Sequence, residues 1–333
     1  MFNNTALDVF IGLAFVYLLY SLFATVINEA IASIFGLRAK MLKHAILRML
    51  SDSATGKAES NSLYTSFFQH ALIKYLGKGE GAAPSYLAPA TFSKAVVDIL
   101  GNAAAPLEAV TAEHVKTALE GIAAATGAPI IPADTGKVLQ SYFAEANGDL
   151  AKFRALLEQW FDDTMNRASG WYKRQTQLIV FFIGVVLAVG FNVDTLQIEK
   201  RLSTDKVTRD ALAQQAVSYV KTHQRPADPT AADSVPHPGS IQEVDSMIVV
   251  VDSVYKADVK GVNALLGLSW SADPDLTKDN MLWKCLGWLI TAVAISLGAP
   301  FWFDTLSMLI KLRGTGPTED EKKKSKSKPP SST

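Results

Sequence analysis

Two carboxylates lie inside long apolar stretches of this chain, where an ionisable side chain is costly and is a functional candidate. Glu29 lies nine residues before Arg38, and Asp304 lies seven residues before Lys311. Each carboxylate is therefore placed one to three helical turns inside a basic flank. Polar residues enter the middle apolar stretch at a similar depth. Together these side chains form a candidate intramembrane polar cluster: Asn28, Glu29, Arg174, Gln175, Gln177, Asp304 and Thr305.

This cluster has two interpretations. The favoured one is structural, with the carboxylates paired to Arg174 or Arg167 so that they fix the packing of the helices. The alternative is an ion or proton path. Both require residues from three separate apolar segments to meet.

Other residue patterns that carry chemistry are weak. Asp162 and Asp163, followed by Asn166, are similar to the acidic motif with which prenyl-processing enzymes hold Mg²⁺, but a second acidic motif is missing. An ion pair of Asp163 with Arg167 in the next helical turn is the simpler interpretation. The single cysteine, Cys285, excludes a disulfide framework within the chain, and the five histidines lack metal-ligand spacing. We therefore expect no catalytic, cofactor or metal site.

Nucleic acid is not an expected partner. The formal net charge is zero, with 32 basic and 32 acidic residues. The glycines of Gly77–Gly81 lack the Lys-Ser/Thr pair of a phosphate loop, and the sequence contains no basic and aromatic motif typical of nucleic-acid binding. The expected partners are membrane lipids, and either another protein or further copies of the chain.

Three apolar stretches are long enough to approach or exceed the thickness of a bilayer. Val9–Leu37 comprises 29 residues, against the roughly 20 that the hydrocarbon core requires. Leu178–Val193 follows an amphipathic helix and an interfacial belt, Trp171–Arg174, so one helix is predicted to run from a soluble domain into the membrane. The third stretch, Met281–Ile310, contains Pro300, which predicts a bend.

Between the first two apolar stretches, the sequence predicts a small all-α domain. Helices are expected over about 63–76, 89–100, 112–125 and 134–146, with Pro89 at a first helical position and Thr111 as an N-cap. The basic stretch 38–50 is amphipathic and is expected to lie on lipid headgroups.

Basic residues predict the orientation. They flank the apolar stretches at 38–48, 167–174 and 311–328, whereas residues 1–8 contain none. Under the positive-inside rule, the N-terminus and residues 194–280 are outside, and residues 38–174 and the C-terminus are in the cytoplasm.

The predicted fold class is an all-α integral membrane protein with three transmembrane helices, a small helical cytoplasmic domain and an extracytoplasmic loop region. Its parts are an N-terminal transmembrane helix (1–37), a basic amphipathic interfacial segment (38–50), a helical cytoplasmic domain (51–148), a long helix continuing into the second transmembrane helix (149–194), an extracytoplasmic region with a Pro-rich mobile loop (195–280), the third transmembrane helix (281–310) and a Lys-rich disordered cytoplasmic tail (311–333).

Three segments carry a resemblance to other proteins: WFDDTMNRASGWYKRQTQ from Trp160, NVDTLQI from Asn192 and LGAPFWFDTLSMLIKLRG from Leu297. They resemble a family of uncharacterised bacterial inner-membrane proteins. The resemblance implies a multi-pass protein of the bacterial inner membrane. It implies no activity and no site residues, because none is known for the family.

The functional expectation is a membrane-anchored scaffold or assembly protein that presents its helical cytoplasmic domain through the continuous helix. The alternative is a subunit of an oligomeric channel or transporter that uses the carboxylate cluster. That alternative requires self-association, because three spans do not easily enclose a path.

Overall fold

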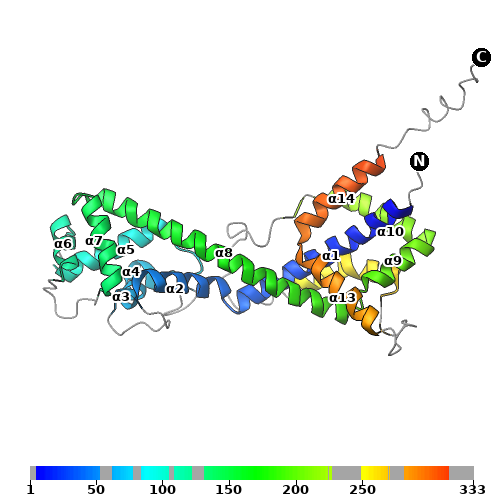
Figure 1. The fold of residues 1–333 in the computed structure, drawn as a ribbon, viewed down its shortest axis with the longest axis horizontal. Helices are drawn as coiled ribbons and strands as arrows, with labels where there is room; N and C mark the ends of the chain where they lie inside the picture. Colours follow the sequence, from blue (N-terminus) through cyan, green and yellow to red (C-terminus); the bar gives the residue numbers. More distant parts are fainter. Residues whose placement is uncertain are drawn as a thin grey trace, which may run out of the picture. The chain divides into compact units, whose positions relative to one another are not determined.

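The computed structural model describes residues 5–52, 62–77, 84–104, 109–121, 131–223, 225–226, 249–268, 270 and 281–314. Every regular element within these ranges is helical, which confirms the all-helical expectation (Figure 1). The chain divides into two compact units. Unit 1 is drawn from Met1–Ile31, Gln175–Val235 and Val244–Thr333, and unit 2 from Ala32–Arg174 and Pro236–Glu243. Most of the predicted Pro-rich loop and of the C-terminal tail lies outside the described residues.

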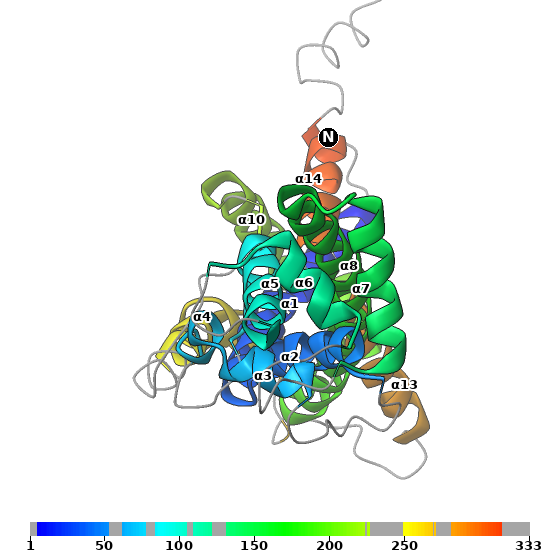
Figure 2. The same ribbon diagram turned by 90° about the vertical axis from the view of Figure 1, so that its left-hand side faces the viewer.

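The helices of unit 2 begin close to where the sequence predicts. They are α2 (Leu37–Leu50), α3 (Leu63–Gln69), α4 (Ala71–Lys74), α5 (Pro89–Ala104), α6 (Ala112–Leu119), α7 (Ala133–Glu145) and the first part of α8 (Leu150–Gly190). Figure 2 shows α5, α6 and α7 side by side.

Local capping explains most of these boundaries. Pro89 begins α5, and the Thr111 hydroxyl caps α6 by accepting a hydrogen bond from the backbone N–H of His114 at 3.3 Å. The helix predicted over 63–76 is instead two short helices. His70 adopts extended backbone angles between them, and its Nδ1 accepts the Leu72 N–H at 3.3 Å, so the ring caps α4.

Aromatic rings fill the core of unit 2. Phe67, Phe92 and Phe153 are fully buried, and Phe92 stacks on Phe161 with ring centroids 4.8 Å apart. Phe153, Leu157 and Phe161 recur at four-residue spacing, so the first part of α8 presents one continuous apolar face to this core.

The apolar face of α2 belongs to the same core, which corrects the expectation for residues 38–50. Leu42, Ile46 and Leu50 are at most 3% exposed and pack with residues of α3, α5 and α8. The face that was expected to enter lipid is therefore covered by protein. Lys40 and Lys43 remain exposed on the outer face. The amphipathic pattern was correct, but it does not distinguish a protein surface from a lipid surface.

Unit 1 is built around α1 (Thr5–Ile34). Its other elements are the last part of α8, α9 (Thr195–Thr204), α10 (Lys206–Thr222), the π-helix η1 (Tyr255–Val259), α12 (Lys260–Leu266), α13 (Met281–Ser296) and α14 (Ala299–Gly314). Ile11, Val16 and Leu18 of α1 are completely buried, and Leu202 of α9 and Leu212 of α10 pack against this part of α1 at Gly12. The first half of α1 therefore contacts mainly protein.

The last part of α8 has a different surface. Leu178, Phe182 and Val186 recur every four residues and are 60%, 58% and 69% exposed. Ile183 and Leu187, on another face, are buried in the core of unit 1. This part of α8 thus packs on protein along one side and exposes an apolar stripe along the other.

The third apolar stretch is not one helix. α13 and α14 are separated by Leu297 and Gly298 and bent by 95°. Gly298 adopts φ +89°, a left-handed conformation that ends α13, and Pro300 then lies in the first turn of α14, where its missing N–H is not needed. The predicted bend is therefore present, and it divides the stretch into two helices of 16 residues each. By length and composition, α1 and α8 are able to cross a membrane, and the bent pair makes a third if it forms one span.

Candidate functional site

Asp304, the central acid of the predicted cluster, has a different partner from the one expected. Its Oδ2 lies 2.9 Å from Nη2 and 3.0 Å from Nε of Arg225, which follows α10. The sequence had favoured Arg174 or Arg167. Because α14 bends away from α13 and packs against α10, Asp304 meets the residues after α10 instead. The ion pair predicted between Asp163 and Arg167 is instead a hydrogen bond to the backbone. Arg167 donates from Nε to the carbonyl oxygen of Asp163 at 3.3 Å.

The remaining members of the cluster lie in different environments. Asn28 is buried, Glu29 and Thr305 are half-buried, and Gln175, Gln177 and Asp304 are exposed. Arg174 belongs to unit 2 and is exposed.

Unit 1 instead contains a buried chain of hydroxyl groups that sequence reasoning missed. Tyr17 Oη lies 2.9 Å from Thr195 Oγ1, and Thr195 Oγ1 lies 2.8 Å from Thr291 Oγ1. The Thr291 hydroxyl also lies 2.7 Å from the carbonyl oxygen of Val193 and 2.9 Å from that of Gly287. Thr291 is completely buried. The chain thereby joins α1, the start of α9 and α13.

The turn between α8 and α9 completes this junction. Asn192 adopts φ +52° and accepts a hydrogen bond from the Trp288 indole N–H at 3.3 Å. Asp194 caps α9 by accepting the N–H of Leu196 at 2.9 Å. The Asp194 carboxylate lies directly against Gly287 of α13, where any side chain would overlap with it. We call Tyr17, Asn192, Asp194, Thr195, Gly287, Trp288 and Thr291 the polar junction.

A cation packs beside the polar junction. The Lys284 ammonium is buried and lies 6.0 Å from the ring centroids of both Trp270 and Trp288. The Trp270 indole N–H donates to the carbonyl of Val189 at 3.1 Å. These contacts tie the start of α13 to the end of α8. The polar junction holds these helices together through hydrogen bonds, because its hydroxyls and amides bond to one another or to the backbone.

An ion pair joins the start of α1 to the end of α14. Asp8, which is 8% exposed, lies with Oδ1 3.2 Å from Nε of Arg313, so the start of α1 and the end of α14 share one end of the unit. Two side chains in contact cannot lie on opposite sides of a hydrocarbon core of about 30 Å. α14 runs back along α1, since Trp302 of α14 also contacts Tyr17 of α1 with ring centroids 4.6 Å apart.

Unit 2 carries a pocket of about 560 Å³. Its lining combines polar and apolar side chains: Arg48, Met49, Ser51, Asp52, Asp134, Thr135, Val138 and Trp160. This volume lies within the range of small-ligand sites. Arg48 also lies 4.7 Å over the ring of Trp171. The pocket is thus able to hold a compact polar group or a side chain of another protein.

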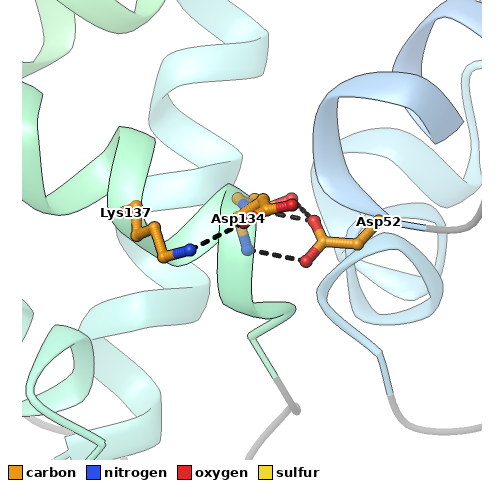
Figure 3. Close-up of polar contacts among 4 residues, drawn as sticks. Asp52, Asp134 and Lys137 are labelled. Atoms are coloured by element: carbon orange, nitrogen blue, oxygen red, sulfur yellow. Dashed lines mark hydrogen bonds and ion pairs between the residues drawn. The ribbon is translucent and has the colours of Figure 1, made fainter.

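Asp52, one of the lining residues, makes polar contacts with the start of α7 (Figure 3). Its carboxylate accepts the backbone N–H of Asp134 at 2.6 Å and that of Thr135 at 3.0 Å, and the Thr135 hydroxyl donates to it at 2.9 Å. Asp52 therefore caps α7 from a distant part of the chain. Lys137 donates to Asp134 at 2.9 Å.

These contacts lower the pKa of Asp52. Partial desolvation acts to raise it, but the hydrogen bonds from Asp134 and Thr135 and the positive charge of Lys137 outweigh that effect. The pKa of Lys137 is raised by its hydrogen bond with Asp134. The pocket lining carries charges of both signs, because Arg48 lies in it together with Asp52 and Asp134.

Comparison with known proteins adds no family. No family model, no curated protein and no solved structure matched the chain. The resemblance to uncharacterised bacterial inner-membrane proteins stays a prediction.

Proposed function

We propose that this protein is a membrane-anchored scaffold that holds a helical binding domain at the bacterial inner membrane. The observation that carries the proposal is the change of surface along α8. Its first part supplies Phe153 and Leu157 to the core of unit 2, and its last part exposes Leu178 and Phe182 as an apolar stripe. Helix α8 belongs to the folded core of unit 2 at its start and exposes apolar side chains at its end. Such a helix is suited to anchoring a domain in lipid.

The charges support a cytoplasmic position for unit 2. Along the sequence, exposed basic residues of α2, Lys40 and Lys43, follow the apolar part of α1, and those of the belt, Lys173 and Arg174, precede the apolar part of α8. In this orientation the start of α1 is outside. The ion pair of Asp8 with Arg313 then brings the end of α14 to the outside as well.

The pocket at Asp52 is the part of unit 2 that we propose to receive a protein partner. Its lining offers charges of both signs, and Met49, Val138 and Trp160 offer apolar contact. Apolar and aromatic side chains beside polar and charged ones are typical of protein-binding surfaces, and Trp and Arg are enriched among the residues that contribute most to binding.

Site-specific crosslinking in intact cells tests this proposal. A photo-reactive amino acid at Val138 should crosslink to a second protein, and the same amino acid at Lys152, exposed on α8 outside the pocket lining, should not. Arg48→Glu should abolish the Val138 crosslink, and Lys152→Glu should leave it intact. A crosslink only between copies of this chain, with a closed oligomer found by native mass spectrometry in detergent, would contradict the scaffold and favour the channel alternative.

A further inference from the structure

Among the described residues that line the pocket of unit 2, Arg48 is the one with a positive charge. Its Cζ lies 4.7 Å over the ring of Trp171. A guanidinium that stacks on an aromatic face keeps its N–H groups available in its own plane, where they match the two oxygens of a carboxylate. No ion pair joins Arg48 to an acid within the part of the chain that the structure describes. The stacking therefore orients a cation that is available to an acid of another molecule.

The two acids of the pocket lining are engaged elsewhere. Asp52 follows Arg48 by four residues, a spacing that would bring the two side chains together within one helix. However, α2 ends before Ser51, whose backbone is extended with φ −146° and ψ 134°. Asp52 instead accepts two backbone N–H groups of α7 at 2.6 and 3.0 Å. Asp134 accepts a hydrogen bond from Lys137 at 2.9 Å. Arg48 is therefore the charge that the pocket can offer to a partner.

The apolar part of the pocket is held rigidly. The Trp160 ring packs edge-on against Tyr142 and Phe92, with ring centroids 5.9 and 6.5 Å apart. Trp160 and Trp171 are eleven residues apart in α8, about three turns and roughly 16 Å along one face of the helix. An aromatic ring that other rings hold in place is suited to anchoring an apolar side chain of a partner. The site thus combines a fixed apolar surface with one oriented cation.

We propose that this pocket recognises an acidic side chain of the partner protein, next to an apolar side chain that packs on Trp160. Arg48 donates hydrogen bonds to the carboxylate, and Trp171 is a positioning residue that keeps the guanidinium oriented. This inference rests on the proposed scaffold function and names the chemistry of its partner. An anionic phospholipid fits less well, because Trp160 lies three turns from Trp171 of the interfacial belt, on the side away from the apolar part of α8.

Fluorine NMR of the full chain in an uncharged detergent tests this inference. The tryptophans are labelled as 5-fluorotryptophan, and Trp160→Phe and Trp171→Phe assign the two signals of the site. The probes are two blocked dipeptides, N-acetyl-Phe-Glu-amide and N-acetyl-Phe-Gln-amide, which differ only in the carboxylate. Arg48→Gln removes the cation. Lys43→Gln, at an exposed position of α2 outside the pocket lining, is the matched control.

The glutamate dipeptide should shift the Trp160 and Trp171 signals with saturation. The glutamine dipeptide should bind about tenfold more weakly, because it lacks the charge-assisted hydrogen bonds. Arg48→Gln should reduce binding of the glutamate dipeptide to that of the glutamine dipeptide, and Lys43→Gln should leave it unchanged. Read from the Trp160 signal, Trp171→Leu should weaken binding of the glutamate dipeptide about two- to fivefold, and Trp171→Phe should restore most of the loss.

The opposing outcomes are distinguishable. Equal binding of the two dipeptides, or no effect of Arg48→Gln, would overturn the carboxylate assignment, and a Val138 crosslink to a second protein in cells would then leave the scaffold standing. Absence of that crosslink in the wild type would refute the scaffold and this inference with it. A Trp171 shift caused by phosphatidylglycerol without peptide, and lost in Arg48→Gln, would assign the arginine to lipid instead.

Discussion

Replacing Thr291 by valine tests whether the hydroxyl chain of the polar junction stabilises unit 1. Valine keeps the shape of threonine but removes the hydroxyl. Thr195 Oγ1 then loses a partner at 2.8 Å and keeps the one at 2.9 Å on Tyr17, while the Val193 carbonyl loses a donor at 2.7 Å. A buried polar group left without its partner costs about 1–3 kcal/mol. We expect the free energy of unfolding to fall by about 2 kcal/mol.

The assay is reversible unfolding of the full chain in detergent, followed by circular dichroism. Thr204→Val is the matched control, because that hydroxyl is exposed and donates to the Lys200 carbonyl of its own helix at 2.8 Å. A double-mutant cycle with Thr195→Val should show that the two losses are not additive, with a coupling of about 0.5–3 kcal/mol. If Thr291→Val and Thr204→Val lower stability equally, or if the two junction losses simply add, the hydroxyl chain does not act as a unit.

Three further changes test other parts of the structure. Gly287→Ala should lower the free energy of unfolding by about 1–3 kcal/mol, because the new methyl group would overlap with Asp194. Gly170→Ala, at an open helical position, should be neutral or stabilising by up to about 1 kcal/mol. Equal effects of the two changes in the same unfolding assay would refute the steric argument. Asp52→Asn should destabilise unit 2 by about 1 kcal/mol at neutral pH through the weakened cap. Because folding lowers the pKa of Asp52 below its usual 3.8, this contribution is present above pH 3.8 and is lost as the pH falls through the folded pKa. The melting temperatures of wild type and Asp52→Asn should therefore converge in acid. A difference in melting temperature that stays constant with pH would refute the role of the charge. Ser169→Pro should break α8, which limited proteolysis would detect as new cleavage near that residue, and an unchanged digest would mean that the helix is already interrupted there.

Local signals in the sequence were sufficient for much of the fold. Pro89 and Thr111 predict the starts of α5 and α6, because a first-turn proline and an N-capping hydroxyl act within a few residues. The spacing of Phe153, Leu157 and Phe161 predicts the core face of α8. Helical pattern on both sides of Gly170 predicts one helix, and α8 is uninterrupted there.

The candidate site could not be predicted in the same way. Asp194, just before α9, has the residue type of an N-cap, and this was the one local signal for the polar junction. Its packing against Gly287, and the contacts of Tyr17 and Thr195 with Thr291, join residues that are far apart in the chain. Residue spacing carries no information on such contacts.

The sequence by itself determined the helical class, the amphipathic faces and the length of the apolar segments, because periodicity, caps and composition act over one or a few turns. Only the tertiary structure decided what covers each apolar face. It buried the apolar face of α2 and the first half of α1 in protein, and it left the stripe of α8 exposed. It also paired Asp304 with Arg225 and Asp8 with Arg313, because the left-handed backbone of Gly298 turns α14 by 95° and an ion pair depends on where two helices meet in space.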